Sequence, residues 1–311
     1  MRIVSLLPGA TEIVCALGLE HQLVGISHEC DFPSHITDLP KVTEDLFPAN
    51  ASSSEIDALV RERMKGERVL YLLNAEKLKA LEPDLLITQT LCDVCAVSES
   101  DVRDVMCAMP GETRLVNMEP EDMDSVFGAI TRVAEAADAV PAGERLTADL
   151  QNRIDAVAQR STALEQSPRV LFLEWLDPPF CAGHWNPELV TLAGGLEVLG
   201  KAGERSRTLE WHEVTQSGAQ VIVIACCGFD INRTAQDLEL LDKIPGWSDL
   251  PAVKSGRIYL INGSHYFSRP GPRLVDSLEI LAHALHPHIH PLPAGLEPAV
   301  AINDLKEETP Q

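Results

Sequence analysis

Residues 119–165 read EPEDMDSVFGAITRVAEAADAVPAGERLTADLQNRIDAVAQRSTALE, and this stretch decides the fold. Its apolar residues recur at helical spacing on both sides of Pro141, a residue that suits the first turn of a helix. We expect one helix before Pro141 and a second of roughly 23 residues after it, which would be about 35 Å long at 1.5 Å per residue. Because strand and helix patterns alternate on either side, the stretch predicts a stiff helical connection between two α/β lobes. A long helix inside one continuous domain is the alternative.

The flanking regions predict mostly parallel sheets, because apolar runs typical of buried strands alternate there with helical patterns. Such sheets bind ligands at the carboxyl ends of their strands. We therefore expect two α/β lobes with a ligand cleft between them. The expected boundaries are an N-terminal lobe over 1–118, a helical segment over 119–167, a C-terminal lobe over 168–290 and a disordered tail over 291–311. The tail is rich in proline and small or charged residues, and we expect the neighbouring His286, His288 and His290 to be solvated, with adventitious metal binding as the alternative.

The composition fits a globular protein and excludes several classes of function. A chain of 311 residues with 45% hydrophobic content can bury two sizeable cores. The formal charge of −22 and the lack of clustered Lys and Arg argue against nucleic acid as a partner. The sequence contains no GxGxxG, P-loop, GxSxG or HExxH motif and no informatively spaced pair of carboxylates. We expect neither a bound nucleotide nor catalysis.

The N-terminus carries an apolar run that Pro8 interrupts and to which Glu12 adds a charge. A secretory leader needs roughly 7–15 uninterrupted apolar residues, and a bilayer span needs about 18. We expect a cytoplasmic monomer that does not insert into a membrane, or a periplasmic protein if a leader precedes this sequence.

Four of the eight cysteines are candidate ligands for zinc or iron. Cys92 and Cys95 form a CxxC pair near an expected helix start, whose positive end favours thiolates. A metal site, a redox pair and tight packing all remain open, since structural zinc sites usually carry two such pairs. At most one of the adjacent Cys226 and Cys227 faces a shared site. The candidate metal ligands are Cys30, Cys92, Cys95 and Cys226.

Polar and aromatic side chains follow most of the expected strands, and we predict that they contact a ligand. In the first lobe these are Pro8, Thr11, Glu12, His28 and Glu29, and in the second Glu174, Trp175, Trp185, Phe229, His265, Tyr266 and Arg269. The aromatic residues would form an apolar wall for a flat ligand. Arg269, held before a Pro-Gly-Pro turn, would bind a carboxylate or phosphate. The structural alternatives are histidines bonded to backbone, aromatics in the core and an arginine ion pair.

The chain resembles the helical-backbone (class III) metal-chelate and vitamin B12 binding proteins of ABC importers. Five segments over residues 1–286 carry the resemblance: IVSLLPGATE at 3–12, LITQ at 86–89, the helices of 119–165, PELV with AGG at 187–195, and RPGPRL at 269–274. The resemblance implies two α/β lobes joined by one long helix, with the ligand held between them and no catalysis.

Two departures from the family pattern shape the functional hypotheses. No leader is recognisable, and all four tryptophans lie at or after Trp175, whereas corrinoid binders of the family press aromatic residues on the ring from both lobes. The chain looks like a leaderless, cobalamin-binding-like branch in which soft ligands replace part of the aromatic clamp.

Three hypotheses follow. The first is a non-catalytic cytoplasmic protein that binds a corrinoid or another metal chelate. The second is a metal-thiolate or thiol-redox protein that uses Cys92 and Cys95. The third is the substrate-binding subunit of an ABC importer, with an ABC permease as its partner and a leader absent from this sequence.

Overall fold

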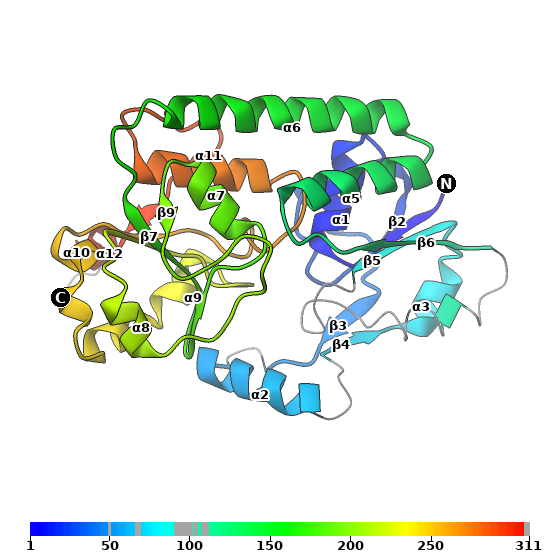
Figure 1. Cartoon of the computed structure of the whole chain (residues 1–311). Helices are drawn as coiled ribbons and strands as arrows, with labels where there is room; N and C mark the ends of the chain where they lie inside the picture. The colour runs from blue at the N-terminus through cyan, green and yellow to red at the C-terminus, as the bar shows by residue number, and fades with distance from the viewer. Residues whose placement is uncertain (49–50, 66–69, 90–101, 103–104, 107–111, 308–311) are drawn as a thin grey trace. The chain divides into compact units, whose positions relative to one another are not determined.

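The chain divides into two compact α/β units, as predicted. Unit 1 comprises Met1–Asp149 and Pro270–Pro272, and unit 2 comprises Leu150–Arg269 and Arg273–Gln311. The computed structural model (Figure 1) describes residues 1–48, 51–65, 70–89, 102, 105–106 and 112–307.

Unit 1 is built on a parallel sheet with the strand order β2-β1-β5-β6. The strands are β1 (Ile3–Ser5), β2 (Leu23–Ile26), β5 (Leu85–Gln89) and β6 (Arg114–Met118). Every residue of β1 and of β5 is buried, because parallel strands at the centre of a sheet are covered on both faces. A separate antiparallel pair consists of β3 (Thr43–Asp45) and β4 (Tyr71–Leu73).

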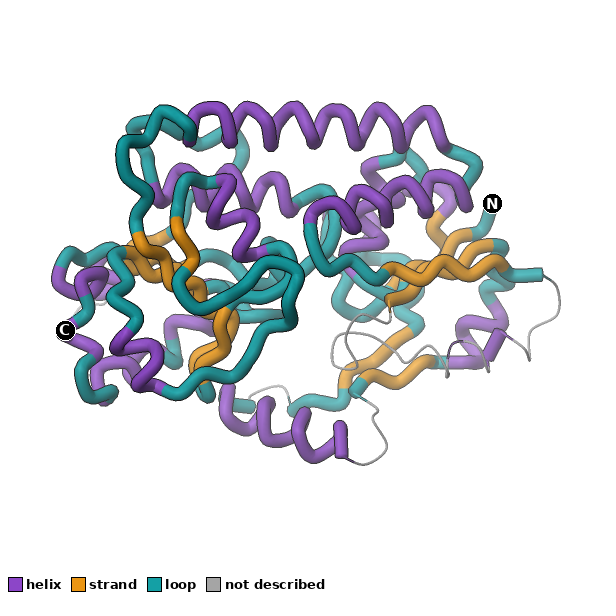
Figure 2. Tube along the Cα trace, viewed as in Figure 1, coloured by secondary structure: helices purple, strands orange, loops and turns teal. Residues whose placement is uncertain are grey.

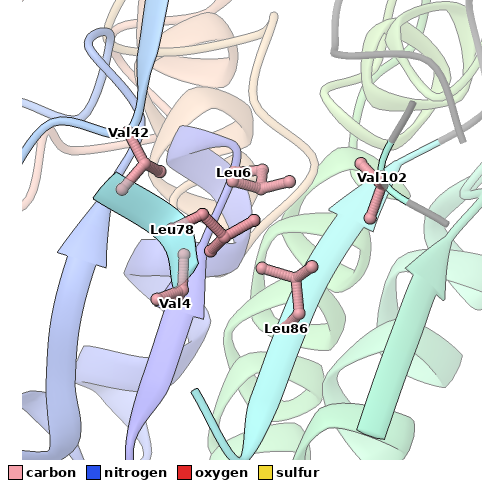
Figure 3. Close-up of a cluster of buried hydrophobic side chains, with 6 residues drawn as sticks. All are labelled: Val4, Leu6, Val42, Leu78, Leu86 and Val102. Carbon is pink, nitrogen blue, oxygen red and sulfur yellow. The ribbon is translucent and has the colours of Figure 1, made fainter. Parts of the chain in front are cut away.

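Part of the core of unit 1 joins the central sheet to the segments around it. Figure 3 shows this cluster of buried side chains, which is formed by Val4, Leu6, Val42, Leu78, Leu86 and Val102. The helices of the unit include α1 (Pro8–Ala16), α2 (Ser53–Lys65), α3 (Ala75–Ala80) and α5 (Met123–Ala136), together with the 3-10 turns Glu20–Gln22 and Ser34–Ile36.

Unit 2 is built on a mixed sheet with the order β12-β11-β10-β7-β8, and β9 also pairs with β7. Its strands are β7 (Arg169–Leu176), β8 (Pro179–Cys181), β9 (Leu196–Glu197), β10 (Val221–Ile224), β11 (Ile258–Leu260) and β12 (Val300–Ala301). The pairs β7–β9, β7–β10 and β10–β11 are parallel, whereas β8 and β12 run antiparallel to their neighbours. The central parallel strands β7 and β10 contain the apolar runs from which we predicted buried parallel strands.

The helices of unit 2 are α7 (Asn186–Leu192), α8 (Trp211–Gln216), α9 (Ile231–Ala235), α10 (Pro251–Lys254), α11 (Leu274–Leu285) and α12 (Ile302–Glu307), with 3-10 turns at Leu238–Lys243 and Trp247–Asp249. Helices α7 and α11 pack against each other (Figure 1). Within the described ranges, no helix has both the length and the apolar character that a membrane crossing requires.

The helical segment contains α5 and the long α6 (Val140–Ser161), which Figure 2 shows as one uninterrupted helix. Residues 140–149 of α6 belong to unit 1 and residues 150–161 to unit 2, so the unit boundary falls inside the helix. Asp122 caps α5 by accepting a hydrogen bond from the backbone of Ser125. Gly143 lets α6 approach α5 closely, because a Cβ there would lie 2.6 Å from Cβ of Ala134.

We expected residues 291–311 to be disordered, and this expectation is wrong for residues 300–307. Val300 and Ala301 form β12 on the edge of β11, and Ile302 begins α12 with 8% of its surface exposed. The expectation of solvated histidines also fails for His290, which is 1% exposed. The average composition of the tail does not reveal that Val300 and Ala301 can form a strand. Their partners, Leu260 and Tyr259 on β11, are distant in the sequence.

Candidate functional site

The sheet of unit 2 reverses its winding direction between β7 and β10. Strands β8 and β9 lie on one side of β7, whereas β10 and β11 follow on the other side. In sheets of this kind, ligands bind outside the carboxyl ends of the strands at the point of reversal. The two residues that the structure brings together there are Trp175, near the end of β7, and Phe229, in the loop after β10.

Trp175, Phe229 and Arg233 form a stack that we call the aromatic wall. The rings of Trp175 and Phe229 have centroids 4.7 Å apart, and the guanidinium carbon of Arg233 lies 4.2 Å from the centroid of Phe229. Both distances suit stacking and cation–π attraction. The indole Nε1 of Trp175 donates to the carbonyl oxygen of Asp177 at 3.1 Å, which fixes the tilt of the ring.

The charge of Arg233 is balanced locally. Its Nη1 lies 3.0 Å from Oδ2 of Asp237, one helical turn further on. The position of the arginine is set by the N-cap of α9, where Asp230 accepts from the backbone N–H of Arg233 at 2.7 Å. Phe229 is 9% exposed between its two neighbours, so the half-buried Trp175 is the more accessible ring of the aromatic wall, with the paired cation of Arg233 on the other side of Phe229.

Glu174 and Trp185, which we predicted to contact the ligand, are committed to the protein itself. The Glu174 carboxylate accepts hydrogen bonds from the backbone of Gly183 at 3.0 Å, from Asn186 Nδ2 at 2.7 Å and from the Ser206 hydroxyl. Burial raises the pKa of Glu174. Trp185 is 5% exposed, and its Nε1 donates to the carbonyl oxygen of Phe267 at 2.7 Å. Both residues hold segments of unit 2 together, because buried polar groups need partners within the protein.

The loop after β11 carries three further predicted residues. The backbone N–H of His265 donates to Asn262 Oδ1 at 2.9 Å, and Tyr266 is buried beneath the guanidinium of Arg273 at 4.9 Å. Arg269 is 7% exposed and donates to Ser264 Oγ at 3.3 Å. The protein covers most of Arg269, and its contact with a carboxylate or phosphate of a ligand stays a prediction.

The winding direction of the unit 1 sheet reverses between β1 and β5, and α1 begins at the end of β1. Pro8 is half-buried at this start, whereas Thr11 and Glu12 are buried on the inner face of α1. The Thr11 hydroxyl bonds to Ser5 Oγ at 2.8 Å and lies 3.0 Å from Sγ of Cys30, which is buried as well. Thr11, Glu12 and Cys30 therefore belong to the interior of unit 1.

His28 lies in a cluster with Glu29, Thr43, Asp45 and Tyr71, which we call the His28 cluster. The His28 ring centroid is 5.3 Å from that of Tyr71, and the Tyr71 hydroxyl donates to Glu29 Oε1 at 3.4 Å. His28 Nε2 is 4.0 Å from Oδ2 of Asp45, beyond hydrogen-bonding distance. Burial is the main cause that lowers the pKa of His28, which favours the neutral ring.

Hydrogen bonding assigns the tautomer of His28. The Thr43 hydroxyl donates its one hydrogen to Ser27 Oγ at 3.1 Å, so it accepts the bond of 2.7 Å from His28 Nδ1. The proton of the neutral ring therefore lies on Nδ1, and Nε2 carries the lone pair. A neutral imidazole oriented through its other nitrogen is a common metal ligand.

The thiol predictions are only partly addressed by the described residues. Burial raises the pKa of Cys226 to about 12, so its thiol is protonated at neutral pH in the absence of a metal ion. Its role as a metal ligand stays a prediction. No cluster of three or more His, Cys, Asp or Glu side chains able to hold a metal ion occurs in the described part of the chain. Cys92 and Cys95 lie outside the described residues.

The sequence reasoning missed Arg233 of the aromatic wall and three residues of the His28 cluster, which are Thr43, Asp45 and Tyr71. Arg233 had a local signal, since it lies only four residues after Phe229 in the sequence. Tyr71 had none, because β4 meets the His28 loop only through its pairing with β3, which is distant in the sequence.

Comparisons with known proteins agree with this architecture. Residues 3–264 match the family described as periplasmic binding protein. An uncharacterised ABC transporter substrate-binding lipoprotein of Bacillus subtilis is 23% identical over 295 residues, which cover 92% of this chain and 80% of that protein. The vitamin B12-binding protein of Vibrio cholerae is 22% identical over 284 residues, covering 89% and 86%. A solved periplasmic heme-binding protein of Pseudomonas aeruginosa matches with a TM-score of 0.72 at 20% identity, covering 96% of this chain and 98% of that one. Since the family match spans most of the sequence, the chain belongs to the periplasmic binding protein family.

Proposed function

We propose that this protein is a non-catalytic binding protein for a corrinoid or a similar flat metal chelate. The observation that carries the proposal is the aromatic wall, in which Trp175 and Phe229 stack at the point where the unit 2 sheet reverses direction. The family is one of binding proteins rather than enzymes, and curated relatives include vitamin B12-binding proteins. Both facts support a binding role.

The chemistry of the aromatic wall suits a flat ring system with neutral substituents. Stacking on aromatic side chains contributes about 0.5–1.5 kcal/mol beyond the burial of area. Asp237 balances the charge of Arg233, so the wall offers no strong attraction for a highly anionic ligand. A corrin ring that carries amide side chains fits this balance better than a ring with several carboxylates.

The His28 cluster supports a metal chelate in particular. Its neutral ring, with the lone pair on Nε2, is suited to coordinate a metal ion that retains an exchangeable axial site. We propose His28 as the coordinating residue, because hydrogen bonding orients its ring and places the lone pair on Nε2.

We further infer that the protein delivers its ligand to an ABC permease on the outer side of the cytoplasmic membrane. A curated relative is named as a lipoprotein of an ABC transporter, which supports this location over the cytoplasmic one expected from the sequence. Fractionation of cells that carry the complete gene tests the inference. Recovery of the protein in the cytosol alone would contradict it.

The test of binding is titration of the purified protein with cyanocobalamin, aquocobalamin and hemin, followed by calorimetry and visible absorption. We expect a saturable site for a cobalamin, and at least a tenfold loss of affinity in Trp175→Ala and in Phe229→Ala. Trp211→Phe is the control, because Trp211 pairs with Trp247 outside the aromatic wall. Unchanged affinity in both wall variants would refute the assigned surface, and no binding of any chelate would refute the function.

Metal-thiolate or thiol-redox chemistry is the competing proposal and rests on Cys92 and Cys95. Elemental analysis of protein purified without oxygen or added metal separates the two. Stoichiometric zinc or iron without an organic chromophore would favour the thiolates, whereas cobalt with a corrinoid absorption band would favour chelate binding.

A further inference from the structure

Three histidines at the end of α11 gather where α6 and α7 also end, all within unit 2. His283 lies in the last turn of α11, and His286 and His290 bound the turn that follows it. The rings of His286 and His290 have centroids 6.3 Å apart. We call these three residues with Ser161 the histidine latch, because they tie the turn to the ends of two other helices.

Each ring donates one N–H to a neighbouring segment. Ser161 Oγ donates to the carbonyl oxygen of Leu192 at 2.8 Å, so it accepts from His290 Nε2 at 3.2 Å. His286 Nε2 donates to the carbonyl oxygen of Gly194 at 3.3 Å. His283 Nδ1 donates to the carbonyl oxygen of His290 at 2.8 Å, since a carbonyl can only accept.

These bonds leave His290 as a neutral ring whose Nδ1 carries a buried lone pair. The residue is 1% exposed, and no group in the described ranges forms a hydrogen bond with Nδ1. A proton added there would create an imidazolium ion that has no acceptor for its second N–H. Burial of a charge without a partner is costly.

The charges around the latch oppose such a proton as well. The charged and titratable groups that act on His290 are Arg160 on α6, His283 on α11 and His286, and Arg257 before β11 acts on His286. All of these are cations when charged. Arg257 is held in place by donating to the carbonyl oxygen of Leu285 at 2.9 Å. Leu192 at the end of α7 and Gly194 just beyond it contribute only backbone carbonyl groups to the bonds described above.

We propose that the histidine latch is an acid-sensitive fastening: protonation of His290 expels its ring and releases the 286–290 turn from the ends of α6 and α7. Release also loosens residues 291–307, because the turn leads directly into the segment that carries β12 and α12. This property is independent of the identity of the ligand.

The direction of the pH dependence follows from the neutral ring. Burial, followed by the neighbouring His286 and Arg160, lowers the pKa of His290 below its ordinary value of 6.5. The released form therefore binds a proton more readily than the fastened form. The latch is fully effective above pH 6.5 and weakens progressively as the pH falls below that value.

Hydrogen exchange of the full-length protein, read by mass spectrometry and corrected for the intrinsic pH dependence of exchange, tests the proposal. We expect peptides covering 286–307 to exchange at least tenfold faster at pH 5.0 than at pH 7.5, while peptides from β7 and β10 stay protected. His290→Gln should abolish this difference, because glutamine keeps an N–H donor for Ser161 and does not titrate. His288→Gln is the control: His288 lies on the same turn but is exposed, so this variant should respond as the natural protein does.

Equal protection of 286–307 at both pH values would overturn the proposal, and so would a response in His290→Gln equal to that of the natural protein. If His290→Gln does not fold, the His290 ring of the natural protein is titrated by NMR. A midpoint below 6.5 that coincides with the loss of protection supports the latch. A midpoint at or above 6.5 overturns it.

Discussion

At the scale of single residues, His28 shows how a hydrogen bond selects chemistry. His28 Nδ1 donates its proton to the Thr43 hydroxyl, so the lone pair of the neutral ring lies on Nε2. We predict that aquocobalamin, whose axial water exchanges, shows a visible band shift on binding that is lost in His28→Gln. Cyanocobalamin affinity should change less than threefold in the same variant, and Thr37→Ser, an exposed change, is the control. A band shift that survives in His28→Gln would rule out coordination by this residue.

The same coordination should depend on pH in a defined direction. Because burial lowers the pKa of His28 below 6.5, the ring stays neutral and able to coordinate at pH 6.5 and somewhat below. The aquocobalamin band shift should therefore persist at pH 6.5 and disappear at lower pH as the ring gains a proton. A band shift that is already half lost above pH 6.5 would contradict the assignment of His28 as a half-buried, neutral ring.

At the scale of elements, the contact of α5 with α6 depends on Gly143. A Cβ at this position would meet Cβ of Ala134 at 2.6 Å, so Gly143→Ala forces the two helices apart. We expect a loss of about 1–3 kcal/mol in the free energy of unfolding, measured by urea denaturation. Gly128→Ala is the matched control within α5, since its Cβ would meet only the end of the Arg132 side chain at 3.4 Å. That change should be neutral or stabilise the protein by up to about 1 kcal/mol.

The terminal helix α12 offers a second test at this scale. Ile302 is 8% exposed at its start, whereas Asp304 is exposed. Ile302→Ala should cost about 2 kcal/mol or more of stability, and Asp304→Ala should stay within about 0.5 kcal/mol. An equal, negligible effect of both changes in thermal unfolding would mean that this segment contributes nothing to the fold.

At the scale of the whole molecule, the net charge of −22 acts on stability. Carboxylates outnumber cations so strongly that self-repulsion opposes the compact state, and salt screens that repulsion. We expect the Tm to rise by several degrees between 10 mM and 500 mM NaCl at pH 7.5, with light scattering reporting the monomer that we predict throughout. A Tm that falls with added salt would show that specific ion pairs outweigh the repulsion.

The sequence was sufficient for features that depend on local patterns. Helical spacing on both sides of Pro141 predicted α5 and α6, and aliphatic runs such as 221–224 predicted the buried parallel strands. Candidate site residues were harder to predict, because their orientation depends on distant partners. Trp185 and Glu174 follow the same pattern as Trp175 in the sequence, yet hydrogen bonds to Phe267 and Ser206 turn them inward. The prediction of a disordered tail failed for the same reason, because β12 is held by its pairing with β11, which is distant in the sequence.

The short segment Pro270–Pro272 belongs to unit 1, although the residues on both sides of it belong to unit 2. Gly9 is shaped to receive it, because a Cβ there would lie 2.7 Å from the carbonyl oxygen of Pro270. During synthesis the ribosome makes Gly9 long before it makes Pro270. Unit 1 therefore cannot be completed until residues 150–269 of unit 2 have been synthesised, so its folding cannot finish before most of the other unit exists. A protein truncated after residue 149 would lack the Pro270–Pro272 segment of unit 1.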